Sequence, residues 1–304
     1  MIGLTRLLWA QVRGMASTAE ALVALADVEV LSPRVARILG QNPGSFTLQG
    51  TNTYVVGTGR RRILIDTGEG KATYAPLLER FLRENSIDID RVIITHWHRD
   101  HTGGIGQVFD LSGKTIPVHK FLDEENDDEL KESNISLEPV LDGAVFSAEG
   151  VTLRAVHTPG HTEDHLCLYM EEENAIFSGD CVLGQGTTHF TNLRQYMSSL
   201  RRIADTKCGM IYPAHGPVLP NGLDKVNEYI AHRQARENQV LELMGSMGPC
   251  TIDALVETIY ANYPPSVHAA AAMGLSQHLE KLKEEGRVRH IEDEDTWVLL
   301  RSNM

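Results

Sequence analysis

The stretch Thr95-His96-Trp97-His98-Arg99-Asp100-His101 decides how the rest of the chain is interpreted. It holds three imidazoles and one carboxylate, which are ligands that a divalent ion such as zinc prefers. The residues just before it, Arg91-Val-Ile-Ile-Thr95, are apolar and β-branched and predict a buried strand. Ligand sites in α/β sheets commonly lie at the carboxyl ends of such strands. The sequence therefore predicts a metal site in an α/β fold.

This stretch offers more ligands than one tetrahedral ion can use comfortably. His96 and His98 alternate along an extended segment and therefore point the same way. Asp100 and His101 come after the turn and can face a neighbouring ion. We therefore expect two metal ions, each completed by ligands from elsewhere in the chain.

Three further candidate ligands follow apolar, strand-like runs later in the chain. A glycine or proline beside each of them marks a turn at the end of a strand. The candidates with their surroundings are His161 in VHTPGHT (156–162), Asp180 in AIFSGD (175–180) and His215 in MIYPAHGP (210–217). They supply the ligands that two ions still need.

Four motifs resemble those of the metallo-β-lactamase superfamily of binuclear hydrolases: THWHRDH (95–101), TPGHT (158–162), FSGD (177–180) and YPAHG (212–216). The resemblance implies an α/β fold, the αββα metallo-β-lactamase sandwich, and two Zn²⁺ ions per chain. The ligands that it implies for the first ion are His96, His98, His161 and Asp180. Those for the second are Asp100, His101, His215 and again Asp180, which bridges the two ions. It also implies that the turn Asp66-Thr-Gly68 supports the metal site from behind.

Further segments resemble, more narrowly, the β-lactamase-like protein 2 family. These are NPG (42–44), TLQGTNTY (47–54), RILIDTGE (62–69), EEENAIFSGDC (171–181) and GTT (186–188). The likeness runs from about Val28 to the last residues. It implies a metal-dependent endoribonuclease that cleaves single-stranded RNA, typically in the mitochondria of animals. Its winged helix is expected at the C-terminal end of the chain.

The chemistry follows from the expected metal pair. Two zinc ions about 3.5–4 Å apart can share a hydroxide, lower its pKa and clamp an electrophile. The hydroxide would attack the phosphorus of a phosphodiester. By analogy with the superfamily, Asp100 is the expected catalytic residue, which orients the nucleophile or carries a proton in addition to binding metal.

The metal ligands alone do not identify the substrate. The same centre can hydrolyse thioesters, so the alternative enzyme is a glyoxalase II-like thioesterase acting on glutathione or carrier thioesters. A net charge of −13 and a pI near 5.4 favour small substrates over tight non-specific RNA binding, although an endonuclease needs only a local basic groove. Arg194, Arg201 and Arg202 could supply such cations or form an ordinary charged helix face. A non-catalytic RNA-binding scaffold is the alternative of another class, and the complete ligand set argues against it.

The N-terminal residues 1–26 resemble a mitochondrial presequence. Arg6 and Arg13 precede the first acidic residue, Glu20, and apolar residues at positions 4, 7, 8 and 12 share one helical face. We therefore expect the mature protein in the mitochondrial matrix. An internal start at Met15 would give a cytoplasmic form instead.

The composition describes an ordinary globular protein, with 42% hydrophobic and 23% charged residues in a chain of 304. No apolar run approaches the roughly 20 residues needed to span a bilayer, so no membrane partner is expected. The four cysteines show no C-x-x-C spacing and are expected to be free thiols in a reducing compartment. Either a monomer or a homodimer is compatible with the sequence.

The expected domains are a hydrolase core at 27–222 and a small winged-helix-like domain at 223–304. In the latter, the sequence predicts a helix over 223–244 halted by Gly245 and Gly248, helices over 252–260 and 267–285, and a hairpin around 293–295. Thr251 is the expected N-cap of the second helix. Lys281 and Lys283 are offset by Glu280, Glu284 and Glu285, which predicts a packing or dimer module rather than a duplex-binding face.

Two segments of the core remain open in function. The loop 44–53 is rich in Gly, Ser, Thr and Asn and either borders the active site or packs locally. The acidic segment 123–132 is expected to be a solvated helix or loop rather than a site.

Overall fold

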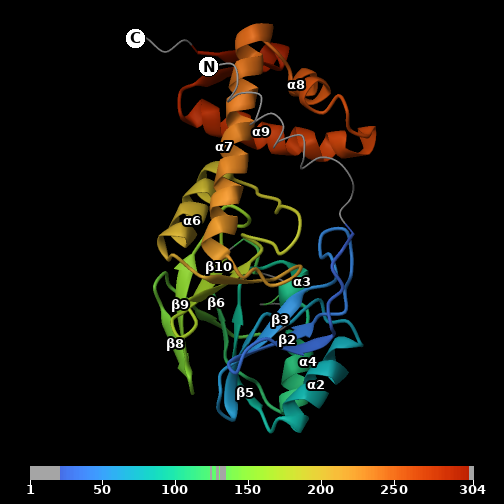
Figure 1. Ribbon diagram of the computed structural model, residues 1–304, viewed down its shortest axis with the longest axis vertical. Coiled ribbons are helices and arrows are strands. Elements are labelled where there is room, and N and C mark those ends of the chain that lie inside the picture. The colour runs from blue at the N-terminus through green and yellow to red at the C-terminus, as the bar shows by residue number, and fades with distance from the viewer. Residues whose placement is uncertain (1–20, 124, 128–129, 131–134, 301–304) are drawn as a thin grey trace. The chain divides into compact units, whose positions relative to one another are not determined.

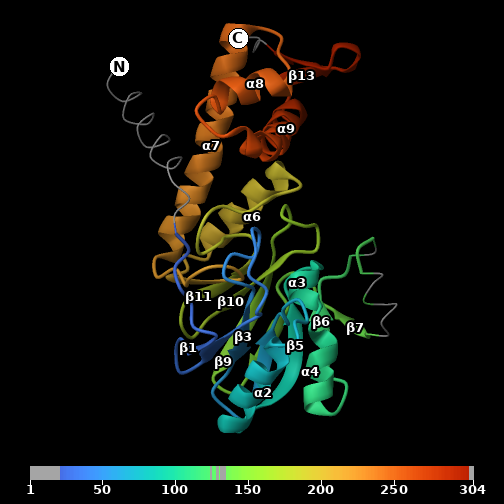
Figure 2. The same ribbon diagram turned by 90° about the vertical axis from the view of Figure 1, so that its right-hand side faces the viewer.

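The computed structural model describes residues 21–123, 125–127, 130 and 135–300, which form two compact units (Figures 1 and 2). The larger unit comprises 22–190 and 195–227, and the smaller includes 191–194 and the described chain from Glu228 onward. The presequence expected at 1–26 falls, up to residue 20, outside the described residues. Among the described helices, none is both long enough and apolar enough to cross a membrane.

Seven strands form the first sheet of the larger unit in chain order. The first four pair antiparallel and the last three run parallel to the fourth: β1 (Val28–Val30), β2 (Val35–Leu39), β3 (Asn52–Val56), β4 (Arg61–Ile65), β5 (Asp88–Ile94), β6 (Val118–Lys120) and β7 (Leu137–Pro139). The turn at 57–60, which contains Gly57 and Gly59, joins β3 to β4, and the predicted strand before the histidine cluster is β5. Helices α2 (Tyr74–Glu84) and α4 (Ile105–Ser112) bury apolar faces against this sheet (Figure 1).

The second sheet of the larger unit has the strand order β12-β11-β10-β9-β8. Its strands are β8 (Val145–Ala148), β9 (Val151–His157), β10 (Leu166–Met170), β11 (Ala175–Gly179) and β12 (Met210–Pro213). Helix α6 (Leu193–Asp205) lies beside it, and the Tyr196 hydroxyl donates to the Cys181 carbonyl at 2.7 Å. The two sheets with their helices form the predicted αββα sandwich.

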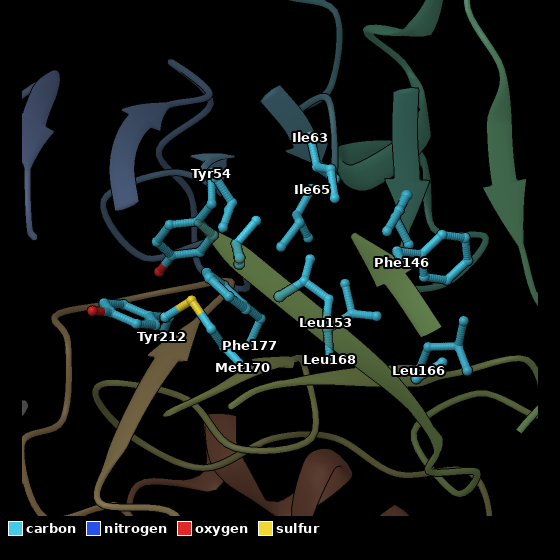
Figure 3. Close-up of a cluster of buried hydrophobic side chains, with 14 of the residues drawn as sticks. Tyr54, Ile63, Ile65, Phe146, Leu153, Leu166, Leu168, Met170, Phe177 and Tyr212 are labelled. Atoms are coloured by element: carbon cyan, nitrogen blue, oxygen red, sulfur yellow. The ribbon is translucent and has the colours of Figure 1, made fainter. Parts of the chain in front are cut away.

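The core between the two sheets is built by alternation along their strands (Figure 3). On β4, Ile63 and Ile65 point to the second sheet, whereas Leu64 between them points to the layer of α2. Facing them are aromatic side chains such as Phe177 and Tyr212, whose stacked rings lie 5.0 Å apart. Each such buried side chain stabilises the fold by about 1.5–3 kcal/mol, so the sandwich is a rigid base for the loops at its edge.

The acidic segment 123–132 differs from the prediction where it is described. Asp127 is fully buried rather than solvated, because its carboxylate lies 2.5 Å from the Nζ atom of Lys120 at the end of β6. The same Nζ atom lies 2.7 Å from Asp164, three residues after the candidate ligand His161. A buried ammonium group requires such partners. The prediction for this segment was therefore wrong at Asp127.

The smaller unit contains three helices and a hairpin among its described residues. These are α7 (Gly222–Met247, of which the part from Glu228 onward belongs to this unit), α8 (Ile252–Ile259), α9 (His268–Glu284), β13 (Val288–Ile291) and β14 (Thr296–Leu299). Thr251 caps α8 as predicted, since its hydroxyl accepts from the Ala254 N–H at 3.2 Å. Gly245 does not halt α7, which continues to Met247 and ends before Gly248, where φ is +77°. The order of helices and hairpin is the expected winged-helix arrangement.

Candidate metal centre

All seven candidate ligands follow the carboxyl ends of strands in the larger unit. His96 and His98 come directly after β5, and the short helix α3 (Arg99–Thr102) carries the next two. The second sheet supplies the others, which follow β9, β11 and β12. The structure brings these side chains together into two adjoining clusters: His96, His98, His161 and Asp180, and Asp100, His101 and His215. In each cluster, the candidate ligand atoms lie within 4.8 Å of one another.

The first cluster is held by three imidazole nitrogens that face one another. The Nδ1 atom of His98 lies 2.9 Å from His96 Nε2 and 3.1 Å from His161 Nε2. The Nδ1 atom of His161 lies 2.7 Å from the His189 carbonyl oxygen and donates to it, which leaves the Nε2 lone pair directed into the cluster. A cation placed between these three nitrogens could bind all of them at once.

Asp66 orients the rings of His96 and His101. The Thr95 hydroxyl donates to Asp66 at 2.9 Å, so it can only accept from the Nδ1–H of His96, which lies 3.0 Å away. His101 Nδ1 lies 2.8 Å from Asp66 and donates to it directly. Both Nε2 atoms therefore face the centre. This is the supporting role expected for the turn at 66–68.

Asp180 lies between the two clusters with one oxygen toward each. Its Oδ2 atom lies 3.5 Å from His161 Nε2, and its Oδ1 atom lies 3.2 Å from His215 Nε2 and 3.6 Å from His101 Nε2. In the second cluster, Asp100 Oδ2 lies 3.2 Å from the Nε2 atoms of both His101 and His215. The geometry thus allows Asp180 to bridge two ions.

The pKa values of the histidines differ between the two clusters. Burial, together with the neighbouring imidazoles, lowers the pKa of His96 well below its usual value and that of His98 to about 4. Although burial opposes protonation, Asp180 and Asp100 raise the pKa of His215 to about 9. His96 and His98 are therefore neutral, whereas Asp100 and Asp180 hold positive charge beside them on His215.

The residues fit a metal pair. Among the described residues, the buried atoms His101 Nε2 and Asp180 Oδ1 have no hydrogen-bond partner, although they lie only 3.6 Å apart. Both atoms face other candidate ligand atoms instead: His101 Nε2 lies 3.2 Å from Asp100 Oδ2, and Asp180 Oδ1 lies 3.2 Å from His215 Nε2. A cation between them would satisfy these converging groups. Neutral imidazoles and carboxylates are the donor set that zinc accepts.

Two glycines allow the backbone to approach these ligands. A Cβ atom on Gly104, just after α3, would lie 2.0 Å from the Thr67 carbonyl oxygen. Gly160, beside the ligand His161, has φ of +124°, and a Cβ atom there would lie 2.3 Å from the Tyr196 nitrogen. A larger residue at position 104 would displace the preceding helix turn with His101, and one at position 160 would displace His161.

Several residues at the site were not singled out from the sequence. The Thr51 hydroxyl lies 3.1 Å from Asp100 Oδ2, so the loop 44–53 does border the centre. His165 Nε2 accepts from the Asp180 backbone N–H at 3.0 Å, and its Nδ1 atom lies 2.8 Å from the Thr158 hydroxyl. The position of His165, four residues after His161 in the motif HTEDH, was the one available signal.

The arginines considered as phosphate contacts form ion pairs. Arg202 contacts both oxygens of Asp142 at 2.8–2.9 Å, and Arg194 contacts Glu284 at 3.1 Å within the smaller unit. Arg201 is exposed. A more suitable cation is Arg99, an exposed residue directly before the ligand Asp100 that makes no ion pair with any residue in the described part of the chain.

Comparison with known families gives two matches along the chain. The family described as the metallo-beta-lactamase superfamily matches residues 46–215, and the beta-lactamase associated winged helix domain matches residues 251–297. The first match covers more than half of the chain and includes all seven candidate ligands. The second confirms the winged-helix prediction.

Relatives with different names match over similar lengths. The chain is 43% identical over 266 residues to the "Beta-lactamase-like protein 2 homolog" of Caenorhabditis elegans, covering 86% of this chain and 88% of that protein. It is 41% identical over 268 residues to the "Atrochrysone carboxyl ACP thioesterase" of Aspergillus fumigatus, covering 83% and 82%. The solved beta-lactamase domain protein of Burkholderia ambifaria has a TM-score of 0.75 at 19% identity, covering 94% of this chain and 97% of that one, which shows a shared fold.

Proposed function

This chain belongs to the metallo-β-lactamase superfamily, and from that premise we propose that it is a zinc-dependent endoribonuclease that hydrolyses single-stranded RNA. The observation that carries the hydrolase part is the position of Asp180, whose two oxygens face two separate ligand clusters. Such a bridge allows two ions to share one substrate, as in binuclear hydrolases of phosphate esters.

The two ions and the protein side chains would have separate roles in hydrolysis. When bound, two zinc ions lower the pKa of a water molecule and offset the negative charge that develops on the scissile group. His96, His98 and His161 would hold one ion, with Asp100, His101 and His215 holding the other. Asp100 is the ligand with the most exposed side chain of the second cluster, at 21%. It is thus placed to orient the attacking water and accept its proton.

Two features support RNA as the substrate. Five segments of the sequence resemble the β-lactamase-like protein 2 family, and this resemblance implies cleavage of single-stranded RNA. The worm relative of that name matches 86% of the chain. Arg99 supplies an exposed guanidinium beside the ligands, which suits a phosphate. The net charge of −13 disfavours phosphate contacts elsewhere on the chain, and salt should weaken this local contact.

A thioesterase is the second candidate. The thioesterase relative of Aspergillus fumigatus is nearly as similar as the worm relative, at 41% identity over 83% of the chain. The same activated water would attack the carbonyl carbon of an acyl-carrier thioester, with a thiolate as the leaving group. Asp100 would orient that water in the same way.

The test compares both substrates with one preparation. The zinc-loaded chain lacking residues 1–20 is incubated with end-labelled single-stranded RNA and, separately, with an acylated carrier protein and lactoylglutathione. We expect internal cuts in the RNA that disappear in Asp100→Asn and after treatment with a chelator. Intact RNA together with hydrolysed thioester would overturn the proposed substrate and favour the second candidate.

Arg99→Gln serves as the matched variant for substrate choice. It removes the exposed cation but no ligand, so we expect weaker RNA cleavage with unchanged zinc content. A salt titration from about 50 to 200 mM should narrow the difference between Arg99→Gln and the unmodified chain, because salt screens phosphate contacts. RNA that binds to the chelated protein without being cut by the loaded one would indicate a scaffold instead.

A further inference from the structure

Thr51 lies at the junction of the two sheets, directly before β3. Its side chain is fully buried, and its backbone pairs with that of the ligand His215 in an isolated antiparallel bridge. The Thr51 hydroxyl lies 3.1 Å from Oδ2 of Asp100. A neutral side chain from outside the ligand set therefore contacts the ligand that is proposed to handle the nucleophile.

The direction of this hydrogen bond follows from the neighbour Asn42. The Asn42 Oδ1 atom accepts from the Thr51 backbone N–H at 2.9 Å, which fixes the orientation of the amide. The Asn42 NH₂ group is then the one that faces the Thr51 hydroxyl, at 3.0 Å, and donates to it. Because a hydroxyl carries a single proton and an ionised carboxylate has none, Thr51 must donate its proton to Asp100.

The contacts on Asp100 all fall on one of its two oxygens. Thr51 Oγ1, His101 Nε2 and His215 Nε2 lie 3.1, 3.2 and 3.2 Å from Oδ2. No hydrogen bond or ion pair from the described residues involves Oδ1, and the side chain keeps 21% of its surface exposed. The chain Asn42–Thr51–Asp100 thus assigns different roles to the two oxygens.

We propose that Thr51 is a positioning residue for Asp100, which holds Oδ2 in the ligand cluster and leaves Oδ1 to face water and substrate. This inference rests on the proposed hydrolase function but not on RNA as the substrate. Without the hydroxyl, the carboxylate can rotate about its Cβ–Cγ bond and exchange its oxygens. The second ion would then bind more weakly, and the attacking water would be less well oriented.

The direct test compares Thr51→Val with Thr51→Ser. Valine keeps the shape but removes the hydroxyl, whereas serine keeps the hydroxyl. For Thr51→Val we expect kcat to fall about 10- to 100-fold with little change in KM, and the affinity for the second zinc ion to fall about 10- to 100-fold. Zinc affinity is measured by competition with a chromogenic chelator and needs no substrate. Thr51→Ser should restore most of both quantities.

Thr53→Val is the matched control. Thr53 is equally buried on β3, and its hydroxyl donates to the Ile38 carbonyl at 2.9 Å and contacts the Tyr74 hydroxyl at 2.9 Å, away from the ligands. Thr53→Val therefore removes the same chemical group two residues further along the chain. We expect a lower midpoint of thermal unfolding with unchanged zinc affinity and unchanged kcat.

Asn42→Asp provides a second variant that leaves Thr51 in place. A carboxylate at position 42 accepts the Thr51 proton, so the hydroxyl no longer donates to Asp100. We expect Asn42→Asp to lose kcat and zinc affinity as Thr51→Val does. Because the Thr51 side chain is still present, such losses would come from the direction of its hydrogen bond rather than from packing.

The outcomes distinguish this inference from the proposed function. Turnover is measured on whichever substrate the unmodified chain cleaves, RNA or thioester, so cleavage of thioester alone overturns the substrate but not the role of Thr51. If the chain cleaves neither, the zinc affinities still decide. Full zinc affinity and full kcat in Thr51→Val, or equal damage in Thr51→Ser, would overturn the positioning role.

Discussion

The metal centre and the Lys281 cluster both bury charged side chains, one in each compact unit, but they satisfy these charges differently. In the Lys281 cluster, the Nζ atom of Lys281 lies 2.5 Å from Glu237 and 2.8 Å from Glu285, and Arg287 lies 3.5 Å from Glu237. Two cations thus meet two anions. In the metal centre, by contrast, no lysine or arginine of the described residues pairs with Asp180, whose Oδ1 atom lies 3.2 Å from His215 Nε2 and 3.6 Å from His101 Nε2.

The difference separates structural charge from functional charge. A buried ion pair with complete partners fixes how helices pack and needs nothing further. Buried carboxylates that face imidazoles alone require a proton or a metal ion among those imidazoles. It follows that breaking the first should affect folding, whereas breaking the second should affect metal content and catalysis.

The largest effect is expected for Asp180→Ala. Because the Asp180 oxygens face both clusters, this change leaves each ion one ligand short. Hydrolysis should fall well beyond the about 100-fold that the loss of an outer hydrogen bond costs, and the bound zinc measured by atomic absorption should drop. Asp88→Ala, which removes an exposed carboxylate paired with Arg60, is the control. Normal turnover and zinc content in Asp180→Ala would show that no ion bridge exists there.

Lys281→Met tests the other side of the comparison. It leaves Glu237 buried without its ammonium partner, so we expect a loss of about 3–5 kcal/mol from the free energy of unfolding of the smaller unit. Urea denaturation and hydrogen exchange of α9 measure this loss. Adding Glu237→Leu should restore most of the stability, since replacing both partners is often neutral. A change in zinc content would contradict the separation of the two regions.

His165→Leu sharpens the comparison within the larger unit. The change leaves the Asp180 backbone N–H unpaired while keeping all seven ligands. We expect zinc affinity or kcat to fall about 10- to 100-fold, a smaller loss than for Asp180→Ala. His119→Leu on β6 replaces a half-buried histidine paired with Glu138 and should change neither quantity. If His165→Leu changes zinc affinity and kcat as little as His119→Leu does, His165 does not support the metal centre.

The smallest effect is a pH dependence of the smaller unit. Burial, reinforced by Arg233, Arg236, Lys281 and His232, lowers the pKa of His278 to about 3. The unfolded chain, with an ordinary pKa near 6.5, binds this proton more tightly than the folded one. Stability is therefore fully present above pH 6.5 and falls as the pH decreases toward 3, by about 1.4 kcal/mol at pH 5.5.

Hydrogen exchange of α9 at pH 7.5 and pH 5.5 tests this dependence. His278→Gln removes the titrating group and should reduce the difference between the two pH values. His232 on α7, whose pKa burial lowers to about 4, should account for the remainder. An identical pH dependence in His278→Gln would assign the effect to other groups.

The sequence predicted which seven side chains come together because their chemistry and their strand-end positions are local signals. Apolar runs before Thr95, Asp180 and His215 identified the strands, and neighbouring turns identified where each strand ends. The apolar run Ile63-Leu64-Ile65 fits the same pattern, since its residues are buried on both faces of β4.

The supporting residues could not be predicted in the same way. The role of Thr51 depends on which segment meets Asp100, 49 positions away, and threonine is too common to signal such a contact. The burial of Asp127 depends on Lys120, so an acidic local composition was misleading. In both cases the decisive partner lies outside the segment that was interpreted.

The two sheets are joined by backbone hydrogen bonds at the edge that carries the metal centre. The Leu166 N–H donates to the Thr95 carbonyl at 2.7 Å, and the Asn52 N–H donates to the Ala214 carbonyl at 2.7 Å. A chain leaving the ribosome therefore cannot complete either cluster from its first sheet alone, and the second ion must wait until His215 has been made. We therefore expect metal binding to follow the synthesis of most of the larger unit, so that a bound ion would show that both sheets have already met.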